Sequence, residues 1–375
     1  MGKHEHNESE FIDIYSSEKP SKKARKASKK KSKKTRTQKA IIAILSTVVA
    51  FCVLVAGTLI FALNYFKYNK TEVDENELAV DIEDSEEHIK NIALFGIDTR
   101  KDNSMKGLSD SIMVMSIDTQ NKTIKLISIM RDSVVDVDGK ITKINAAYSK
   151  GGPQLAIKTI NQNFGLDITD YATVNFGGMA KLIDIVGGVE VEVTKGEIND
   201  KYYGINAAIG EQCQVLGIMD KYNSLLVKTP GKQILNGVQA VAWARIRHQP
   251  TATGERDDYG RTARQRHVLN ELFKRAANMS LLKYPSFIKA MLPHVETSLS
   301  YNEIIKLAPV IKGGSLEGTR IPYDNCVIGS GSGVAGGVYY NITYASELMK
   351  AYIYDNITFD AYIAEHPIDK TPWVK

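Results

Sequence analysis

The feature that most constrains this chain is an apolar run near its start. Residues 40–66 contain no charged side chain. A helix needs about 20 apolar residues to cross the hydrocarbon core of a bilayer, so this run can span one with some tilt. The alternative is a cleaved signal peptide, whose apolar region is about 7–15 residues long and is followed by small residues. Here the run ends in the bulky sequence FALNYF, which favours an uncleaved membrane anchor.

Positive charge is concentrated before the apolar run. Residues 1–39 hold 13 Lys or Arg and 5 Asp or Glu, whereas the rest of the chain holds 35 and 38. Basic residues that flank a span stay in the cytoplasm, so we expect residues 1–39 to form a basic cytoplasmic tail and everything after residue 66 to be extracellular. Topology and anionic lipid explain the tail. Because the remainder is slightly acidic, we expect no nucleic-acid partner.

The part after the anchor divides by composition. Residues 67–87 are rich in Asp and Glu and poor in aromatics, which predicts an acidic extracellular linker, and residues 88–375 form one extracellular domain. Cys213 and Cys326 both lie in this domain, where a disulfide can persist, but the sequence leaves open whether they are bonded. No CxxC pair or paired Cys/His spacing occurs, so a zinc site is not expected.

From Ile89 onward the pattern is that of an α/β fold. Apolar runs bounded by turn residues predict strands, and 3.6-residue spacing predicts helices. We expect a central mixed β-sheet flanked by helices in three layers (α/β/α), preceded by the one transmembrane helix. The expected strands cover residues 89–97, 111–117, 123–129, 171–176 and 188–193, and the expected helices cover 153–164, 178–186, 236–244 and 261–277.

Several common catalytic motifs are absent. A Walker A loop needs Ser or Thr after its Gly-Lys pair, but the Gly-Lys pairs here are followed by His4, Ile141 and Gln233. A nucleophile elbow needs Ser at the centre of GxSxG, where the glycine-rich loop has Gly331. The seven His residues form no HExxH motif. Covalent serine hydrolysis and zinc hydrolysis are therefore disfavoured.

Arginines and aspartates provide the remaining chemistry. Asp98 ends a predicted buried strand, where open α/β sheets place their ligands, and Asp110 opens the next strand. Arginine grips phosphate with two parallel hydrogen bonds, and carboxylates beside phosphate require a cation such as Mg²⁺ between them. The pattern thus predicts a phosphate site with a divalent metal. The alternative is a solvated, salt-bridged arginine face.

These residues lie in stretches that resemble the LytR-CpsA-Psr family of bacterial cell-wall enzymes. The resemblance covers a motif core over residues 91–266, in family order. The matching stretches are NIALFGIDTR (91–100), SDSIMVMSID (109–118), ISIMRDSVV (128–136), KINAAYSKGG (143–152), VNFGGMAKLIDIVGGVEVEV (174–193), PGKQILNGVQAVAWARIR (230–247) and DYGRTARQR (258–266). The order of short tail, single span and outer catalytic domain is also similar to this family.

The resemblance implies a metal-dependent phosphotransferase on the outer face of the cell membrane of a Gram-positive-type bacterium. Such an enzyme moves an anionic glycopolymer, such as wall teichoic acid or capsular polysaccharide, from undecaprenyl pyrophosphate to peptidoglycan. The new bond is a phosphodiester. The implied cofactor is Mg²⁺ or Mn²⁺, and the partners are the lipid-linked glycopolymer, peptidoglycan and the membrane.

The resemblance also assigns roles to residues. It implies that Asp98 and Asp110 hold the metal. The implied catalytic residues, which grip or orient the pyrophosphate, are Arg131, Arg245, Arg247, Asp258, Arg261 and Gln265. Further substrate-binding residues are expected to be Arg100, Asp132, Lys143 and Arg264. This chain departs from the family pattern at Leu108, where Arg is frequent, and in a longer stretch between Arg247 and Asp258.

Two other functions remain open at this stage. The same site would serve a polyprenyl pyrophosphate phosphatase that uses water as the acceptor, or a non-catalytic envelope regulator that binds lipid pyrophosphate. In each case a polyprenyl tail, which gains about 0.8 kcal/mol per buried CH₂, needs an apolar groove in the protein. The apolar helices at residues 155–164 and 179–186 are candidates to line it, or they are ordinary core.

Overall fold

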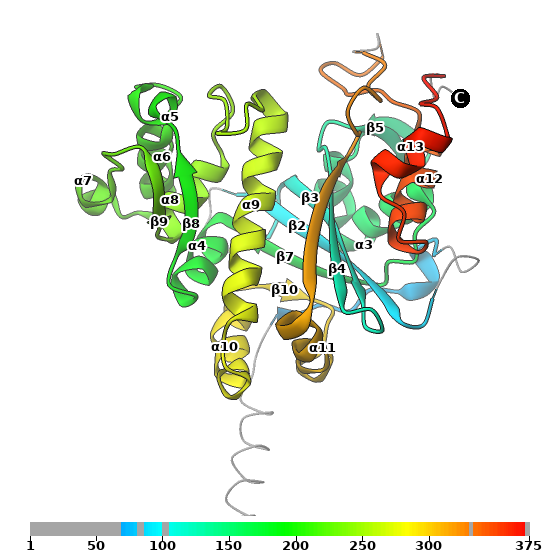
Figure 1. Ribbon diagram of the computed structural model, residues 1–375, viewed down its shortest axis with the longest axis horizontal. Coiled ribbons are helices and arrows are strands. Elements are labelled where there is room, and N and C mark those ends of the chain that lie inside the picture. The colour runs from blue at the N-terminus through cyan, green and yellow to red at the C-terminus, as the bar shows by residue number, and fades with distance from the viewer. Residues whose placement is uncertain (1–68, 81–85, 100–104, 330–332, 372–375) are drawn as a thin grey trace, which may run out of the picture. The chain divides into compact units, whose positions relative to one another are not determined.

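The computed structural model describes residues 69–80, 86–99, 105–329 and 333–371 (Figure 1). The chain divides into two units, Met1–Phe66 and Lys67–Lys375. The predicted tail, the predicted span and Arg100 lie outside the described residues. Within the described part, no helix combines the length and apolar character needed to cross a membrane.

A seven-stranded mixed sheet forms the centre of the second unit, with the strand order β1-β10-β7-β2-β3-β4-β11. Its central strands β2, β3 and β4 are antiparallel neighbours, while β2 pairs with β7 and β4 with β11 in parallel. The predicted mixed sheet is therefore confirmed. The strands are β1 (Asn69–Lys70), β2 (Ile89–Asp98), β3 (Leu108–Asp118), β4 (Thr123–Ile129), β7 (Asp170–Asn175), β10 (Glu296–Thr297) and β11 (Ser315–Ile321).

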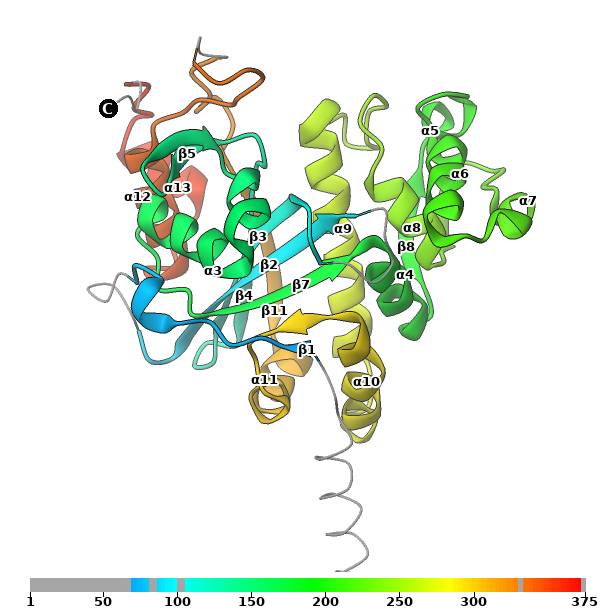
Figure 2. The same cartoon turned by 180° about the vertical axis from the view of Figure 1, so that it is seen from behind.

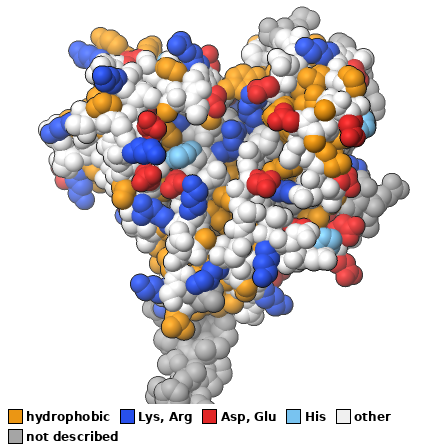
Figure 3. Space-filling model, viewed as in Figure 1, with side chains coloured by type: hydrophobic (Ala, Val, Ile, Leu, Met, Phe, Trp, Pro, Cys, Tyr) orange, Lys and Arg blue, Asp and Glu red, His pale blue; other side chains and the backbone are white. Residues whose placement is uncertain are grey.

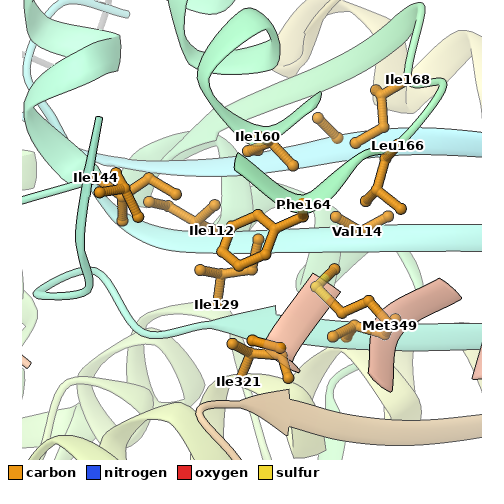
Figure 4. Close-up of a cluster of buried hydrophobic side chains, with 14 of the residues drawn as sticks. Ile112, Val114, Ile129, Ile144, Ile160, Phe164, Leu166, Ile168, Ile321 and Met349 are labelled. Atoms are coloured by element: carbon orange, nitrogen blue, oxygen red, sulfur yellow. The ribbon is translucent and has the colours of Figure 1, made fainter. Parts of the chain in front are cut away.

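Three helices, α3 (Asn145–Phe164), α12 (Ile342–Ile353) and α13 (Phe359–Glu365), belong to one side of this sheet (Figure 2). Their apolar side chains meet those of the central strands in the main core, where Phe164 packs among Ile112, Val114 and Met349 (Figure 4). Ile160 is also almost fully buried there. Residues 155–164 are consequently core, and they do not form the lipid groove considered above.

The other side of the sheet is covered by α9 (Asp257–Ala277) and α11 (Tyr301–Gly313), with α10 (Tyr284–Met291) beside them (Figure 1). Helix α9 begins four residues earlier than the sequence predicts. The amide of Asp257 donates to the carbonyl of Arg247 at 2.9 Å. This long-range hydrogen bond satisfies one of the free donors of the helix start and places Asp258 in the first turn.

A second apolar cluster lies beside the sheet. The predicted strand at 188–193 pairs with a later segment in a separate two-stranded sheet rather than in the central one. The elements of this cluster are α4 (Phe176–Ile185), β8 (Val189–Val193), α5 (Lys195–Asn199), α6 (Ile205–Leu216), α7 (Tyr222–Leu225), β9 (Gly231–Leu235) and α8 (Gly237–Ala244). A small hairpin of β5 (Val134–Val137) and β6 (Lys140–Lys143) completes the described strands.

The two cysteines of the second unit, Cys213 and Cys326, do not form a disulfide. Cys213 is buried in the cluster beside the sheet, and Cys326 is buried in the main core. Within the described part of the chain both are free thiols. Burial raises the pKa of each thiol, so both behave as small apolar side chains.

The described part of the predicted linker is attached to the domain. Strand β1 pairs with β10 at the edge of the central sheet. Leu78 is fully buried, and its carbonyl accepts a hydrogen bond of 3.0 Å from Asn161 Nδ2. Residues 69–80 thus differ from the free, solvated linker that their acidic composition suggests.

Candidate functional site

A β-bulge between β2 and β3 positions the two candidate metal ligands. Gly96 pairs with Ser111 and Ile97 with Ser109, so Asp110 is the extra residue on β3. A bulge redirects such a side chain away from the regular alternation of the strand. A Cβ on Gly96 would lie 2.9 Å from the Ser111 Cβ, so this close approach requires glycine. Asp98, at the end of β2, lines the same pocket as Asp110.

Arg131 lies two residues after the end of β4 and connects three carboxylates. Its Nη1 donates to Asp110 Oδ1 at 2.6 Å. Its Nε lies 3.3 Å from Asp258 Oδ2 and 3.5 Å from Asp132 Oδ2. Burial opposes the charged form, but the hydrogen bond and the three negative charges outweigh it and raise the pKa of Arg131. Arg131 is a fixed cation at the carboxyl end of its strand.

Helix α9 contributes a second buried cation. Arg261 Nη2 donates to Asp258 Oδ2 at 2.9 Å, and Arg261 Nη1 lies 3.8 Å from Asp110 Oδ2. Burial lowers the pKa of Arg261 to about 10 against the attraction of Asp258, which leaves it charged at neutral pH. Gln265, one turn later on the same face, lines the pocket as well.

The end of α8 supplies two more arginines. The helix stops at Ala244, and both Arg245 and Arg247 line the pocket. The Arg245 guanidinium lies over the Phe176 ring, 4.6 Å from its centroid, and Arg245 Nη2 is 3.4 Å from Glu211 Oε2. Arg247 Nε is 3.6 Å from Asp258 Oδ1. Four predicted arginines therefore converge on one region.

Two of these guanidinium groups keep donors without a protein acceptor. Arg245 Nη1 and Arg261 Nε are buried, and no described residue accepts a hydrogen bond from either nitrogen. An unsatisfied buried donor costs about 1–3 kcal/mol, more when it is charged. An oxyanion bound in the pocket would remove this cost, so these two atoms point to an anionic ligand.

The site consists of two adjoining pockets. The arginine pocket has a volume of about 230 Å³, and the apolar pocket beside it has about 290 Å³. Phe176, Arg245 and Gln265 line both. The arginine pocket is lined by Asp98, Asp110, Phe176, Tyr202, Tyr203, Gly204, Ala208, Glu211, Arg245, Ile246, Arg247, His248, Arg261 and Gln265.

The apolar pocket lies between the sheet and the helices of the neighbouring cluster. Strand residues such as Met113 form one side, and helix residues such as Val268 and Phe273 form the other. Met179 and Leu182 of α4 also line it, so the second helix considered for a lipid groove does contribute. The pocket suits a flexible hydrocarbon chain.

The predicted substrate-binding residues Lys143 and Arg264 contact different carboxylates. Lys143 Nζ lies 3.0 Å from Asp132 Oδ1, next to Arg131. Arg264 points away from the site: it is fully buried, and its Nε and Nη2 donate to Glu197 Oε1 at 2.9 and 2.7 Å. It belongs to the lining of neither pocket. Its observed contacts join α9 to α5, and its predicted role in substrate binding stays a prediction.

The residues present can be compared with the needs of a divalent metal. Among the described residues, no group of three or more His, Cys, Asp or Glu side chains is arranged to hold a metal ion. Mg²⁺ commonly binds through one or two carboxylates together with substrate phosphates and waters. Asp98 and Asp110, which line one pocket, fit an ion that is completed by phosphate oxygens.

The sequence patterns missed several residues of the arginine pocket. Phe176, Tyr202, Tyr203, Glu211 and His248 all line it. The adjacent tyrosines in a polar stretch were a usable signal, because tyrosine joins an apolar ring to a polar hydroxyl and is enriched at binding surfaces. Nothing in the sequence distinguishes Glu211, whose part depends on a helix packing beside α8.

Comparison with known proteins identifies the family of this chain. Residues 60–351 match the family model described as the LytR_cpsA_psr family. The chain belongs to the LytR_cpsA_psr family. Basic and acidic side chains are interspersed on the face of the described residues that carries α9 and β11 (Figure 3).

Two curated relatives are named as teichoic acid transferases. TagV of Bacillus subtilis is 32% identical over 245 residues, which cover 64% of this chain and 57% of TagV. TagU of Bacillus anthracis is 29% identical over 302 residues, which cover 77% of this chain and 88% of TagU. Both are named polyisoprenyl-teichoic acid–peptidoglycan teichoic acid transferases. The match thus spans less than two thirds of TagV.

Solved structures of the family share the fold. The crystal structure of B. subtilis TagV aligns with a TM-score of 0.53 at 26% identity, covering 72% of this chain and 99% of the chain in that crystal structure. The structure of YwtF (TagT) with bound octaprenyl pyrophosphate lipid aligns with a TM-score of 0.52 at 20% identity, covering 76% and 98%. The second likeness concerns the fold alone.

Proposed function

We propose that this chain is a membrane-anchored extracellular transferase. It moves an anionic glycopolymer, wall teichoic acid or a capsular polysaccharide, from undecaprenyl pyrophosphate to peptidoglycan and forms a phosphodiester. The transferase names of TagV and TagU support the reaction class. The apolar run at residues 40–66 supports the anchor.

The joining of the two pockets is the observation that carries this proposal. A polyprenyl pyrophosphate has a hydrocarbon tail and a charged head separated by a single bond. The apolar pocket and the arginine pocket meet at Phe176, Arg245 and Gln265, so one ligand can occupy both. Arg245 lies at the junction and has one buried donor for which no described residue is an acceptor, which suits the first phosphate after the lipid.

The arrangement of the arginines supports a displacement at phosphorus. Arg131 and Arg261 converge on Asp110 from two elements and would hold the pyrophosphate oxygens together with Arg245. A peptidoglycan hydroxyl attacks the sugar-linked phosphorus and gives its proton to a carboxylate of the pocket. The bond from this phosphorus to the bridging oxygen breaks, and polyprenyl phosphate leaves. Fixed cations aimed at the oxygens stabilise the charge that develops on the leaving group.

Asp98 and Asp110 are the residues that would hold Mg²⁺ or Mn²⁺. The ion would supply positive charge to the pyrophosphate. Asp258 has a separate task, because its oxygens lie within 3.6 Å of nitrogens of Arg131, Arg247 and Arg261. It keeps three guanidinium groups in one orientation before the substrate arrives.

A transfer assay tests the proposal. The full chain in detergent receives a radiolabelled lipid-linked teichoic acid precursor, peptidoglycan and Mg²⁺, and label in the insoluble fraction is counted. We expect transfer by the wild type, loss of transfer with a chelator, and at least 100-fold slower transfer by Arg245→Ala, since removing one preorganised donor costs about 10²–10³ in rate. Arg275→Ala, near the far end of α9, is the matched control.

Other outcomes identify the alternatives. Soluble labelled polymer with no insoluble product would indicate a phosphatase. Tight binding of the lipid without turnover under all conditions would indicate a regulator. Unchanged transfer by both Arg131→Ala and Arg245→Ala would contradict the catalytic assignment.

A further inference from the structure

Two tyrosine rings stand exposed at the rim of the arginine pocket. Tyr202 is 74% exposed and Tyr203 is 57% exposed, and both line the pocket. They occupy the turn between α5 and α6, and the strand carboxylate Asp110 lines the same pocket. Large aromatic surfaces left open beside a charged site indicate a ligand that covers them.

Several contacts hold the turn between α5 and α6 in place, unlike an ordinary surface loop. Asp200 Oδ1 accepts from the amides of Tyr202 and Tyr203 at 2.9 and 2.8 Å, and these hydrogen bonds lower the pKa of Asp200. Gln249 Nε2 donates to the other oxygen of Asp200 at 2.5 Å. A Cβ on Gly204 would lie 2.3 Å from the Glu197 carbonyl oxygen. The backbone of both tyrosines is therefore held in place before a ligand binds, which lowers the cost of ordering this turn on binding.

The segment after Arg247 supports the same turn. The His248 ring packs against the edge of Tyr203, with 4.5 Å between the ring centroids. Gln249, the next residue, provides the hydrogen bond to Asp200. His248 itself also lines the arginine pocket. The turn between α5 and α6 is therefore supported by a second segment of the chain, the one that follows Arg247.

The chemistry of the rim suits a sugar rather than a lipid or a protein. Tyrosine offers an apolar ring face with a polar hydroxyl at its edge, and Lys201 Nζ lies 5.8 Å from the Tyr202 ring centroid. A pyranose presents C–H groups on its faces and hydroxyls around its edge, which matches both features. A stable protein interface buries about 800 Å² per partner, far more than two rings supply.

We propose that Tyr202 and Tyr203 form a stacking platform for the pyranose of the donor saccharide, the sugar attached directly to the pyrophosphate. This inference rests on the proposed function. The lipid pocket joins the arginine pocket at Phe176, Arg245 and Gln265, and the tyrosine rim is a separate part of the arginine-pocket lining. A donor with its tail in the lipid pocket and its phosphates on the arginines extends its first sugar toward this rim.

Binding measurements test the platform without requiring turnover. The full chain in detergent is titrated with undecaprenyl pyrophosphate and with the same lipid carrying one N-acetylglucosamine on its pyrophosphate. We expect the wild type to bind the sugar-linked lipid about tenfold more tightly, the size of one aromatic stacking contact. The double variant Tyr202→Ala/Tyr203→Ala removes this difference, whereas Tyr202→Phe and Tyr203→Phe retain it. Leu282→Ala, at another exposed apolar position, is the control.

Several outcomes would overturn the platform. Equal weakening of both lipids by the double variant would mean that the rings only support the pocket. Phe variants as weak as the Ala variants would mean that the hydroxyls, not the ring faces, bind. A changed KM for peptidoglycan with an unchanged affinity for the donor would place the acceptor there. A wild type that prefers the sugar-linked lipid but transfers nothing would refute the proposed transferase and leave the platform standing.

Discussion

At the scale of single residues, one carboxylate organises most of the positive charge. Asp258 contacts Arg131, Arg247 and Arg261 through its two oxygens. Without it, three guanidinium groups would repel one another in a partly buried site. The arginines can therefore be aligned before a substrate is bound, and less reorganisation is needed when the pyrophosphate arrives.

Replacing Arg261 with lysine tests whether the fork of donors matters beyond the charge. In Arg261, Nη2 of the planar guanidinium donates to Asp258 while Nε stays available to the ligand. Lysine keeps the charge but lacks this planar arrangement of donors. We expect kcat for transfer to fall about 100-fold. The measurement is the steady-state rate with lipid-linked donor. Arg275→Lys on the same helix should change it less than twofold, and equal rates for both variants would contradict the role of the fork.

The buried pair Glu197–Arg264 leads to a prediction about stability. Both side chains are fully buried, and Glu197 Oε1 also accepts from Trp243 Nε1 at 3.0 Å. Removing one partner of a buried ion pair costs about 3–5 kcal/mol, because the other charge stays buried. Glu197→Gln should lower the free energy of unfolding of fragment 67–375 by that amount, measured by urea denaturation.

The control for this prediction is Glu192→Gln on the exposed face of β8, which should change the unfolding free energy by less than about 0.5 kcal/mol. Folded Glu197→Gln protein should bind prenyl pyrophosphate as the wild type does. A large loss of lipid affinity with unchanged stability would instead support the substrate-binding role that the sequence suggests for Arg264.

At the scale of helices and strands, the sequence predicts elements well where local pattern decides them. The run 123–129 is a strand with those bounds because both of its faces are buried, including the polar side chains of Lys125 and Ser128. The start of α9 is missed because a distant carbonyl, that of Arg247, satisfies the Asp257 amide. The pairing of β8 with β9 is likewise a long-range event that no local period encodes.

The apolar pocket gives a prediction for strand β7. Ala172 lines this pocket, and its small side chain leaves space above the strand. Ala172→Phe should fill part of the pocket and weaken binding of octaprenyl pyrophosphate at least tenfold, while inorganic pyrophosphate, which needs only the arginine pocket, binds as before. Calorimetric titration of both ligands provides the comparison.

The matched control is Ala361→Phe, at an exposed position of α13 far along the chain. It should leave both affinities unchanged. If Ala172→Phe weakens the two ligands by the same factor, the change has disturbed the arginine pocket, and the lipid assignment of the apolar pocket loses its support.

At the scale of the whole molecule, the sequence predicts which residues gather near the site. It does not predict which of them face the substrate and which are structural. Spacing alone places Arg261, Arg264 and Gln265 on one helical face. The fold divides them, because the buried carboxylate of Glu197 requires a cation and Arg264 is the one in reach. Which arginine faces the substrate and which one is structural is decided by contacts between segments more than 60 residues apart.

The division of the chain at residue 66 provides the last prediction. The donor lipid is confined to a membrane, and an anchor on the enzyme raises its effective concentration there to the millimolar range. Fragment 67–375 should therefore transfer polymer in detergent at a rate within about twofold of the full chain, since both pockets lie within it. On vesicles at nanomolar enzyme, it should be on the order of 100-fold slower than the full chain. Replacing residues 40–66 with an unrelated apolar helix should restore the rate.

Two other results would contradict this prediction. If the fragment were as fast as the full chain on vesicles, the apolar run would not serve as an anchor for catalysis. If the fragment were inactive in detergent as well, residues 1–66 would have a part in the site itself.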